Sequence, residues 1–108
     1  MADEATLSAE DQATVEAELA AMQDELANTP ADVVIANHAV GLFQLAAIHL
    51  NRRPPNLDEG RLAIDAMACL VDGLGDQLGE QAPTLQDALA QLRLAYVQLA
   101  QAGPDASL

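Results

Sequence analysis

The chain has 108 residues, enough for one domain, and a formal net charge of −13, with 17 acidic residues against 4 arginines. This acidity argues against a nucleic-acid partner, because phosphate binding depends on cationic contacts. Apolar residues make up 51% of the chain but aromatic residues only 2%. The core must therefore consist of Leu, Ala, Val and Ile, and the abundance of good helix formers predicts an all-α fold.

The first predicted helix lies within residues 1–28 and is acidic throughout. Ser8, three residues before Asp11, resembles a capping box that starts this helix after a frayed segment at residues 1–7. Its larger apolar residues are spaced four, three and four apart, which makes a narrow seam for one partner helix: Val15, Leu19, Met22 and Leu26. Such a charge run commonly serves as a solubilising arm, and binding of a basic protein partner is the alternative.

The second predicted helix covers residues 29–51. Thr29 as N-cap, followed by Pro30, marks its start. Residues 33–51 contain no Asp, Glu, Lys or Arg, and their apolar side chains point all round the axis. A helix of this kind belongs inside an assembly, so we expect a homodimer. The expected interface includes two residues that lie off the seam of the last helix: Val34, Leu42, Phe43, Leu45, Leu94 and Val97.

Residues 56–102 predict a helical hairpin. The Arg-Arg-Pro-Pro run at 52–55 breaks the chain, and Asn56 with Glu59 caps the next helix. That helix ends at Gly73 or Gly79, and we favour Gly79 as its C′ residue. Thr84 is expected to cap the fourth helix, which Gly103-Pro104 ends.

Few residues suggest chemistry. Cys69 is the only cysteine, which excludes an internal disulfide, and its apolar neighbours predict a small core residue. His38 and His49 share a helix face but stand about 16 Å apart, so they cannot hold one metal. We expect partly buried, hydrogen-bonded histidines, with no catalytic residue, no metal and no cofactor. The alternative is a ligand-binding protein or enzyme with a pocket near His38, His49 and Asp65.

A membrane-associated helix is a second alternative, since residues 33–50 reach the lower limit for a span. Asn37 and Gln44 are costly in hydrocarbon, so we expect no membrane partner. The acidic N-terminus has no basic region or apolar core of a signal peptide, which favours the cytosol.

Three segments carry a family resemblance: Ile48-His49-Leu50, the run from Asn56 to Asp65 (NLDEGRLAID), and the run from Leu89 to Tyr96. They resemble the apolar helix ending in His-Leu, the N/D-L-x-x-A-R-x-x-I-D segment and the closing helix of a bacterial domain-of-unknown-function family, numbered 1844. The resemblance covers residues 33–99, with Gly60 in place of the usual Ala. It implies small helical proteins and no catalytic residue.

Together these patterns predict a single all-α domain of four helices, a bundle completed by dimerisation. Its parts are an acidic helix at 1–28, a buried central helix at 29–51 and a hairpin at 56–102. The expected function is a non-catalytic, cytosolic interaction or regulatory module that acts through association of helix faces.

Overall fold

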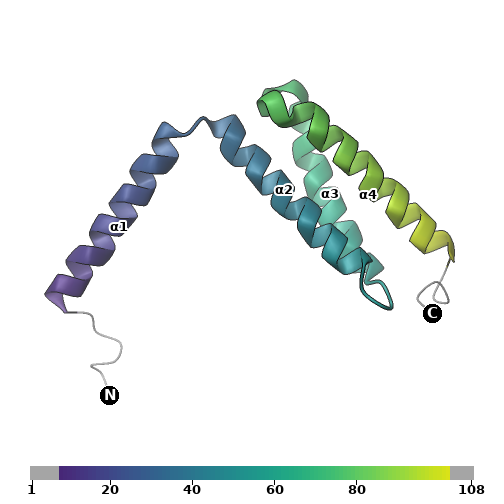
Figure 1. The fold of residues 1–108 in the computed structure, drawn as a ribbon, viewed down its shortest axis with the longest axis horizontal. Helices are drawn as coiled ribbons and strands as arrows, with labels where there is room; N and C mark the ends of the chain where they lie inside the picture. The colour runs from purple at the N-terminus through teal and green to yellow at the C-terminus, as the bar shows by residue number, and fades with distance from the viewer. Residues whose placement is uncertain (1–7, 103–108) are drawn as a thin grey trace, which may run out of the picture. The chain divides into compact units, whose positions relative to one another are not determined.

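A computed structural model of the chain describes residues 8–102, which contain helices and no strand. The elements are α1 (Ala9–Asn28), α2 (Ala31–Leu50), α3 (Leu57–Leu74), a 3₁₀ segment η2 (Gly75–Gln81) and α4 (Ala82–Ala102) (Figure 1). The all-α prediction is confirmed. The expected fraying of residues 1–7 and the stop at Gly103-Pro104 lie outside the described residues.

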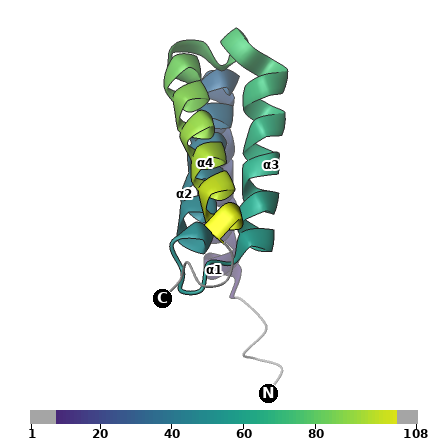
Figure 2. The same cartoon turned by 90° about the vertical axis from the view of Figure 1, so that its right-hand side faces the viewer.

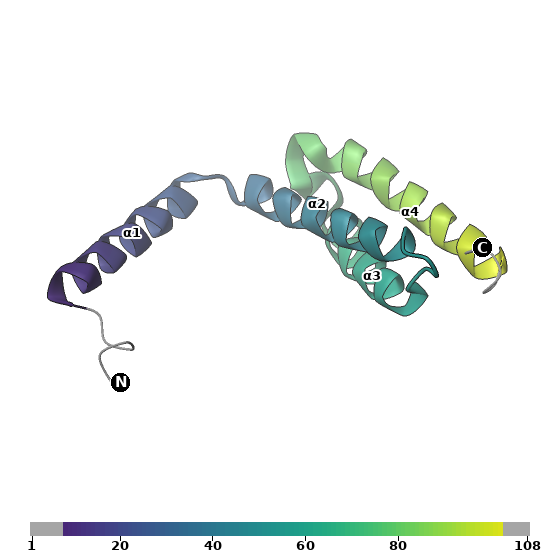
Figure 3. The same cartoon turned by 60° about the horizontal axis from the view of Figure 1, so that its bottom comes forward.

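The chain divides into two compact units, Met1–Pro30 and Ala31–Leu108. In the second unit α2, α3 and α4 lie side by side, and consecutive helices run in opposite directions (Figure 2). The loop at 51–56 joins α2 to α3 at one end, and η2 joins α3 to α4 at the other (Figure 3). The packed bundle therefore has three helices rather than the four expected, since α1 supplies no residue to its core.

The α1 helix begins where the sequence predicted. The Ser8 hydroxyl accepts a hydrogen bond from the Asp11 amide at 3.0 Å, which satisfies one free donor of the first turn. Thr29 was expected to cap α2, but it ends α1 instead. Its amide donates to the Leu26 carbonyl and its hydroxyl donates to the Glu25 carbonyl at 2.7 Å. The hydroxyl of Thr29 therefore bonds to α1, the preceding helix, and does not cap α2.

The fully buried residues of α2 are mostly alanines, and the largest buried side chains of the core come from the rest of the bundle. Met67, Val71, Leu78 and Leu89 are the largest fully buried side chains, and all belong to α3, η2 or α4. The residues that α2 buries are Ala36, Ala39, Ala46 and Leu50. Short side chains on one helix let the axes approach closely, so the larger side chains of the other two helices can fill the space between them.

A glycine allows the close approach of α2 and α3 beside their connecting loop. A Cβ added at Gly60 would lie 2.7 Å from Cδ2 of Leu50, which is closer than such atoms come in proteins. The Asn56 side chain accepts from the Glu59 amide and caps α3, as predicted. Gly60 thus sits at the point where the first turn of α3 presses on the last turn of α2.

The third helix ends earlier than predicted. Gly75, with φ of 53°, is its C-cap, and Gly79, with φ of 78°, lies inside η2 rather than at the helix end. The fourth helix starts at Ala82 and not after Thr84. These differences share one cause: the 3₁₀ segment turns Leu78 back into the end of the core, where it is 2% exposed.

Cys69 is exposed, so the prediction of a buried core residue is wrong. Met67 and Val71, four residues apart, both face the core. Cys69 stands two residues from each, which places it about 200° round the helix from Met67. Apolar neighbours in the chain suggested burial, but the helical period turns this side chain outward.

Alanine substitutions at two glycines should change stability in opposite directions. Gly79→Ala combines a positive φ with a Cβ only 2.5 Å from Oδ2 of Asp32, so we expect it to lower the free energy of unfolding by about 1 kcal/mol or more. Gly73→Ala meets nothing within 4 Å and should raise it by up to about 1 kcal/mol. Chemical denaturation followed by circular dichroism measures both, and equal effects would contradict the assignment of Gly79.

Candidate functional site

The fully buried residues of α2 are three alanines and Leu50, while several of its large apolar side chains face solvent. Ala36, Ala39 and Ala46 are at most 1% exposed, whereas Leu45 is 45% and Ile48 60% exposed. Ile35, Leu42 and Phe43 pack against the core, but Leu45 and Ile48 do not, although burying a large apolar side chain stabilises more than burying Ala. The outer side of α2 is therefore the feature of the bundle that its own folding does not explain.

We call this outer side the neutral face, defined by the exposed residues Val33, Asn37, Val40, Gly41, Gln44, Leu45 and Ile48. At about 100° per residue they fall within an arc of about 140°, on the side of α2 away from the buried alanines. None is charged. Apolar residues scattered singly on a surface are ordinary, whereas here Val33, Val40, Leu45 and Ile48 are exposed along one side of a single helix.

The other two helices of the bundle expose charged residues, several on α3 and two, Asp87 and Arg93, on α4. On α3, Arg61 lies 3.8 Å from Asp65, and the Arg93 guanidinium of α4 donates to Asp72 of α3 at 2.9 Å. Arg61 and Asp65 are one helical turn apart in the sequence, but the bond across 21 residues of chain needed the fold. These exposed ion pairs contribute little to stability. They do leave α2 as the helix whose outer side is free of charge.

The expected interface residues fall on three different parts of the bundle. Leu42 and Phe43 are half-buried and pack against the core of their own chain. Val34 is half-buried and Leu45 exposed, and both lie within the arc of the neutral face. Leu94 and Val97, which lie off the seam of the last helix, are exposed on α4 at 57% and 45%.

Sequence reasoning missed Val33, Val40, Gly41 and Ile48 as candidate contact residues. A helix apolar on all sides has no polar side to mark its outside, so hydrophobicity could not orient it. The alanine spacing carried the missing signal. Ala36, Ala39 and Ala46, three and seven residues apart, share one side, and a line of small residues indicates the side of closest helix contact.

The histidines do not meet in a pocket. His38 is exposed, with Nδ1 2.8 Å from the Val34 carbonyl oxygen. His49 is half-buried, and its Nδ1 has no hydrogen-bond partner among the described residues. Asp65 is exposed on α3 beside Arg61. Within residues 8–102 no group of three His, Cys, Asp or Glu side chains could hold a metal ion.

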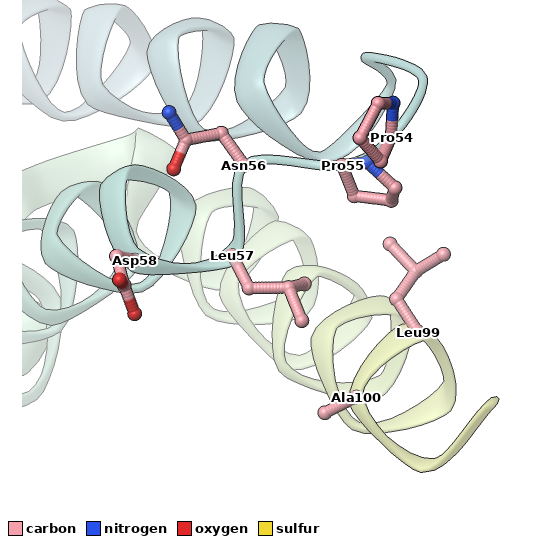
Figure 4. Close-up of a pocket in the computed structure, with 7 residues that line it drawn as sticks. All are labelled: Pro54, Pro55, Asn56, Leu57, Asp58, Leu99 and Ala100. Carbon is pink, nitrogen blue, oxygen red and sulfur yellow. The ribbon is translucent and has the colours of Figure 1, made fainter. Parts of the chain in front are cut away.

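Two open hollows lie between α3 and α4. The larger, about 580 Å³, is where α4 passes the 51–56 loop, and Figure 4 shows its lining: Pro54, Pro55, Asn56, Leu57, Asp58, Leu99 and Ala100. The smaller, about 420 Å³, is lined by Arg61, Ile64, Asp65, Arg93, Tyr96 and Val97. Asp65 lines the smaller hollow, but neither hollow is lined by a histidine, so the three residues of the ligand-binding alternative are not gathered at either.

No family model, curated protein or solved structure matches the chain. The α2 helix is, by length and composition, the one helix within residues 8–102 that could cross a membrane. The core helix of a soluble protein meets the same criteria. The exposed amides of Asn37 and Gln44 on the neutral face would lose water in hydrocarbon without gaining hydrogen bonds, which favours a protein neighbour over lipid.

Two leucines three residues apart should separate the core side of α2 from its neutral face. Leu42→Glu places a charge against the core, so we expect a loss of about 2–4 kcal/mol in the free energy of unfolding. Leu45→Glu, on the exposed side, should change it by less than about 0.5 kcal/mol. Urea denaturation of dilute protein measures both. Equal losses would show that the neutral face is not exposed in the folded chain.

Proposed function

We propose that this chain is a non-catalytic, cytosolic helical module that acts by association, and that it forms a homodimer through the neutral face of α2. The observation that carries the proposal is the orientation of α2, which buries alanines in its own bundle and exposes Val40, Leu45 and Ile48. Burial of apolar surface is the main driving force of such association, and the exposed row provides it.

Charge supports a second copy as the neighbour. Each copy carries a formal net charge of −13, so two copies repel wherever carboxylates face each other. The neutral face contains no carboxylate, and a contact between two neutral faces avoids that repulsion along the whole helix. A symmetric contact of the same surface on both copies is the commonest arrangement of soluble dimers.

We also propose that the chain is related to the bacterial family it resembles over residues 33–99. The buried core supports this, since all of its residues lie between Ala36 and Leu92, inside the region of resemblance. The shared pattern would then be a pattern of core packing and helix capping. That relation is compatible with an association module, because it brings no catalytic residue with it.

A charge placed on the neutral face should dissociate the dimer. We expect Ile48→Glu to weaken dimerisation by about tenfold or more, because each copy would bring an unpaired charge into an apolar contact. Leu62→Glu is the matched control, since Leu62 on α3 is 66% exposed and lies outside the neutral face. Sedimentation velocity across the micromolar range measures both. A wild-type chain that stays monomeric throughout would reject the proposal.

A second association is suggested by α1. Its seam residues Val15, Leu19, Met22 and Leu26 are 41% to 58% exposed, and α1 buries no residue. Most helical stability in proteins comes from packing of an apolar face. This helix also has Asp24 and Glu25 near its C-terminal end and no base in its last turn, which the helix dipole disfavours. A basic amphipathic helix from a partner protein would cover the seam and neutralise the acids beside it, such as Glu18 and Glu25.

A model peptide can test this second association. We expect the full chain to bind an amphipathic helical peptide with leucines on one side and lysines on the flanks, and the affinity to fall as salt rises. Leu19→Asn should weaken the binding by about tenfold, because it interrupts the seam. Fluorescence anisotropy measures the affinity, with an unpatterned lysine peptide as control. Equal binding of both peptides would leave α1 as a solubilising arm.

A further inference from the structure

The glycines of the bundle fall into two groups. Gly60 sits where an added Cβ would collide with a neighbouring side chain, and Gly75 and Gly79 have positive φ. At Gly41 and Gly73 an added Cβ would meet nothing within 4 Å. Both lie inside α-helices, where Gly is less favourable than Ala. Neither glycine is therefore required by the packing of the single bundle.

The surroundings of these two unexplained glycines differ. Gly73 lies near the end of α3 and directly follows the exposed Asp72. Gly41 lies in the middle of α2, within the neutral face, with Asn37 and Leu45 one turn away on either side. The absent side chain leaves a notch in the exposed, uncharged side of α2, between the amides of Asn37 and Gln44 and next to Val40 and Leu45. Gly73 has no such setting.

A notch of this kind changes how closely a second helix can approach. Helix axes usually pack 8–10 Å apart, and the distance depends on the side chains at the contact. Where a helix offers Gly, the backbone of its neighbour can come nearer and make Cα–H···O contacts. The larger neighbours Val40 and Ile48 then pack on either side of the crossing point, where their exposed surface becomes buried.

We propose that two copies of this chain cross their α2 helices at Gly41, with the backbone of each helix seated in the notch of the other. The inference rests on the proposed association through the neutral face and adds its crossing point. The second copy is the occupant because its own neutral face is equally free of charge, whereas the rest of an acidic chain would be repelled. In a symmetric pair Gly41 meets Gly41, so each substitution acts twice.

Substitutions at Gly41 and Gly73 in the full chain test the crossing point. Gly41→Leu should weaken the dimer by about tenfold or more, because it overfills the contact, and Gly41→Ala should weaken it less. Gly73→Leu and Gly73→Ala are the matched controls and should leave the dissociation constant within about twofold. Sedimentation equilibrium measures these constants.

A second measurement separates a contact from a helix effect. Both Ala and Leu favour a helix more than Gly does, so the thermal midpoint of dilute, monomeric protein should stay the same or rise in all four variants. Only the Gly41 variants should combine this with a weaker dimer. A Gly41→Leu variant that dimerises like the wild type would overturn the crossing point, and would leave association through the neutral face standing.

Two other outcomes overturn more than the crossing point. A wild-type chain that is monomeric at every concentration rejects the association and the crossing together. A monomeric chain that binds phosphatidylcholine vesicles, and loses that binding in Ile48→Glu, would identify lipid as the occupant of the neutral face. Either result contradicts a second copy.

Cross-linking gives an independent readout of the same geometry. With Cys69→Ser in the background, Gly41→Cys brings two thiols together at the crossing point, where a disulfide needs Cα atoms about 4.4–6.8 Å apart. The Gly73→Cys variant in the same background is the control. We expect mild oxidation to link the first variant into dimers much faster than the second. Equal rates would overturn the proposal.

Discussion

The close packing of the alanine side of α2 against α3 and α4 is the contact on which the rest of the bundle depends. Ala36, Ala39 and Ala46 are fully buried, so the backbone of α2 itself forms one wall of the core. Met67 and Leu89, which are also fully buried, belong to the same core. In a chain with few aromatic residues, this is how a small core reaches ordinary packing density.

The same packing decides what α2 shows to its surroundings. A helix has one circumference, and with the alanines turned inward the larger residues Val40, Leu45 and Ile48 must point outward. While exposed, these side chains add no burial energy to the isolated chain. Covering them with another surface would supply that stabilisation. The association proposed for the neutral face follows from the way the core is built, and it needs no catalytic group.

In this chain most of the acidic residues and the uncharged surface lie on different helices. Carboxylates are concentrated on α1 and on the outer side of α3, whereas α4 has only Asp87. They favour solubility and repel copies of the same chain. The outer side of α2 has no charge, so two copies do not repel each other there. The notch at Gly41 would then select how two helices meet, since one register brings both glycines together.

The residue pattern was sufficient for the features that depend on short stretches of chain. The helices, the caps at Ser8 and Asn56 and the break at the paired prolines follow from side chains within a few residues of the backbone groups they serve. The end of α3 at Gly75, the inward turn of Leu78 and the bond between Arg93 and Asp72 depend on helices that meet only after folding. The orientation of α2 belongs to the same class. Its apolar residues surround the axis, so hydrophobicity favours no direction, and only contact with α3 and α4 selects the alanine side for the core.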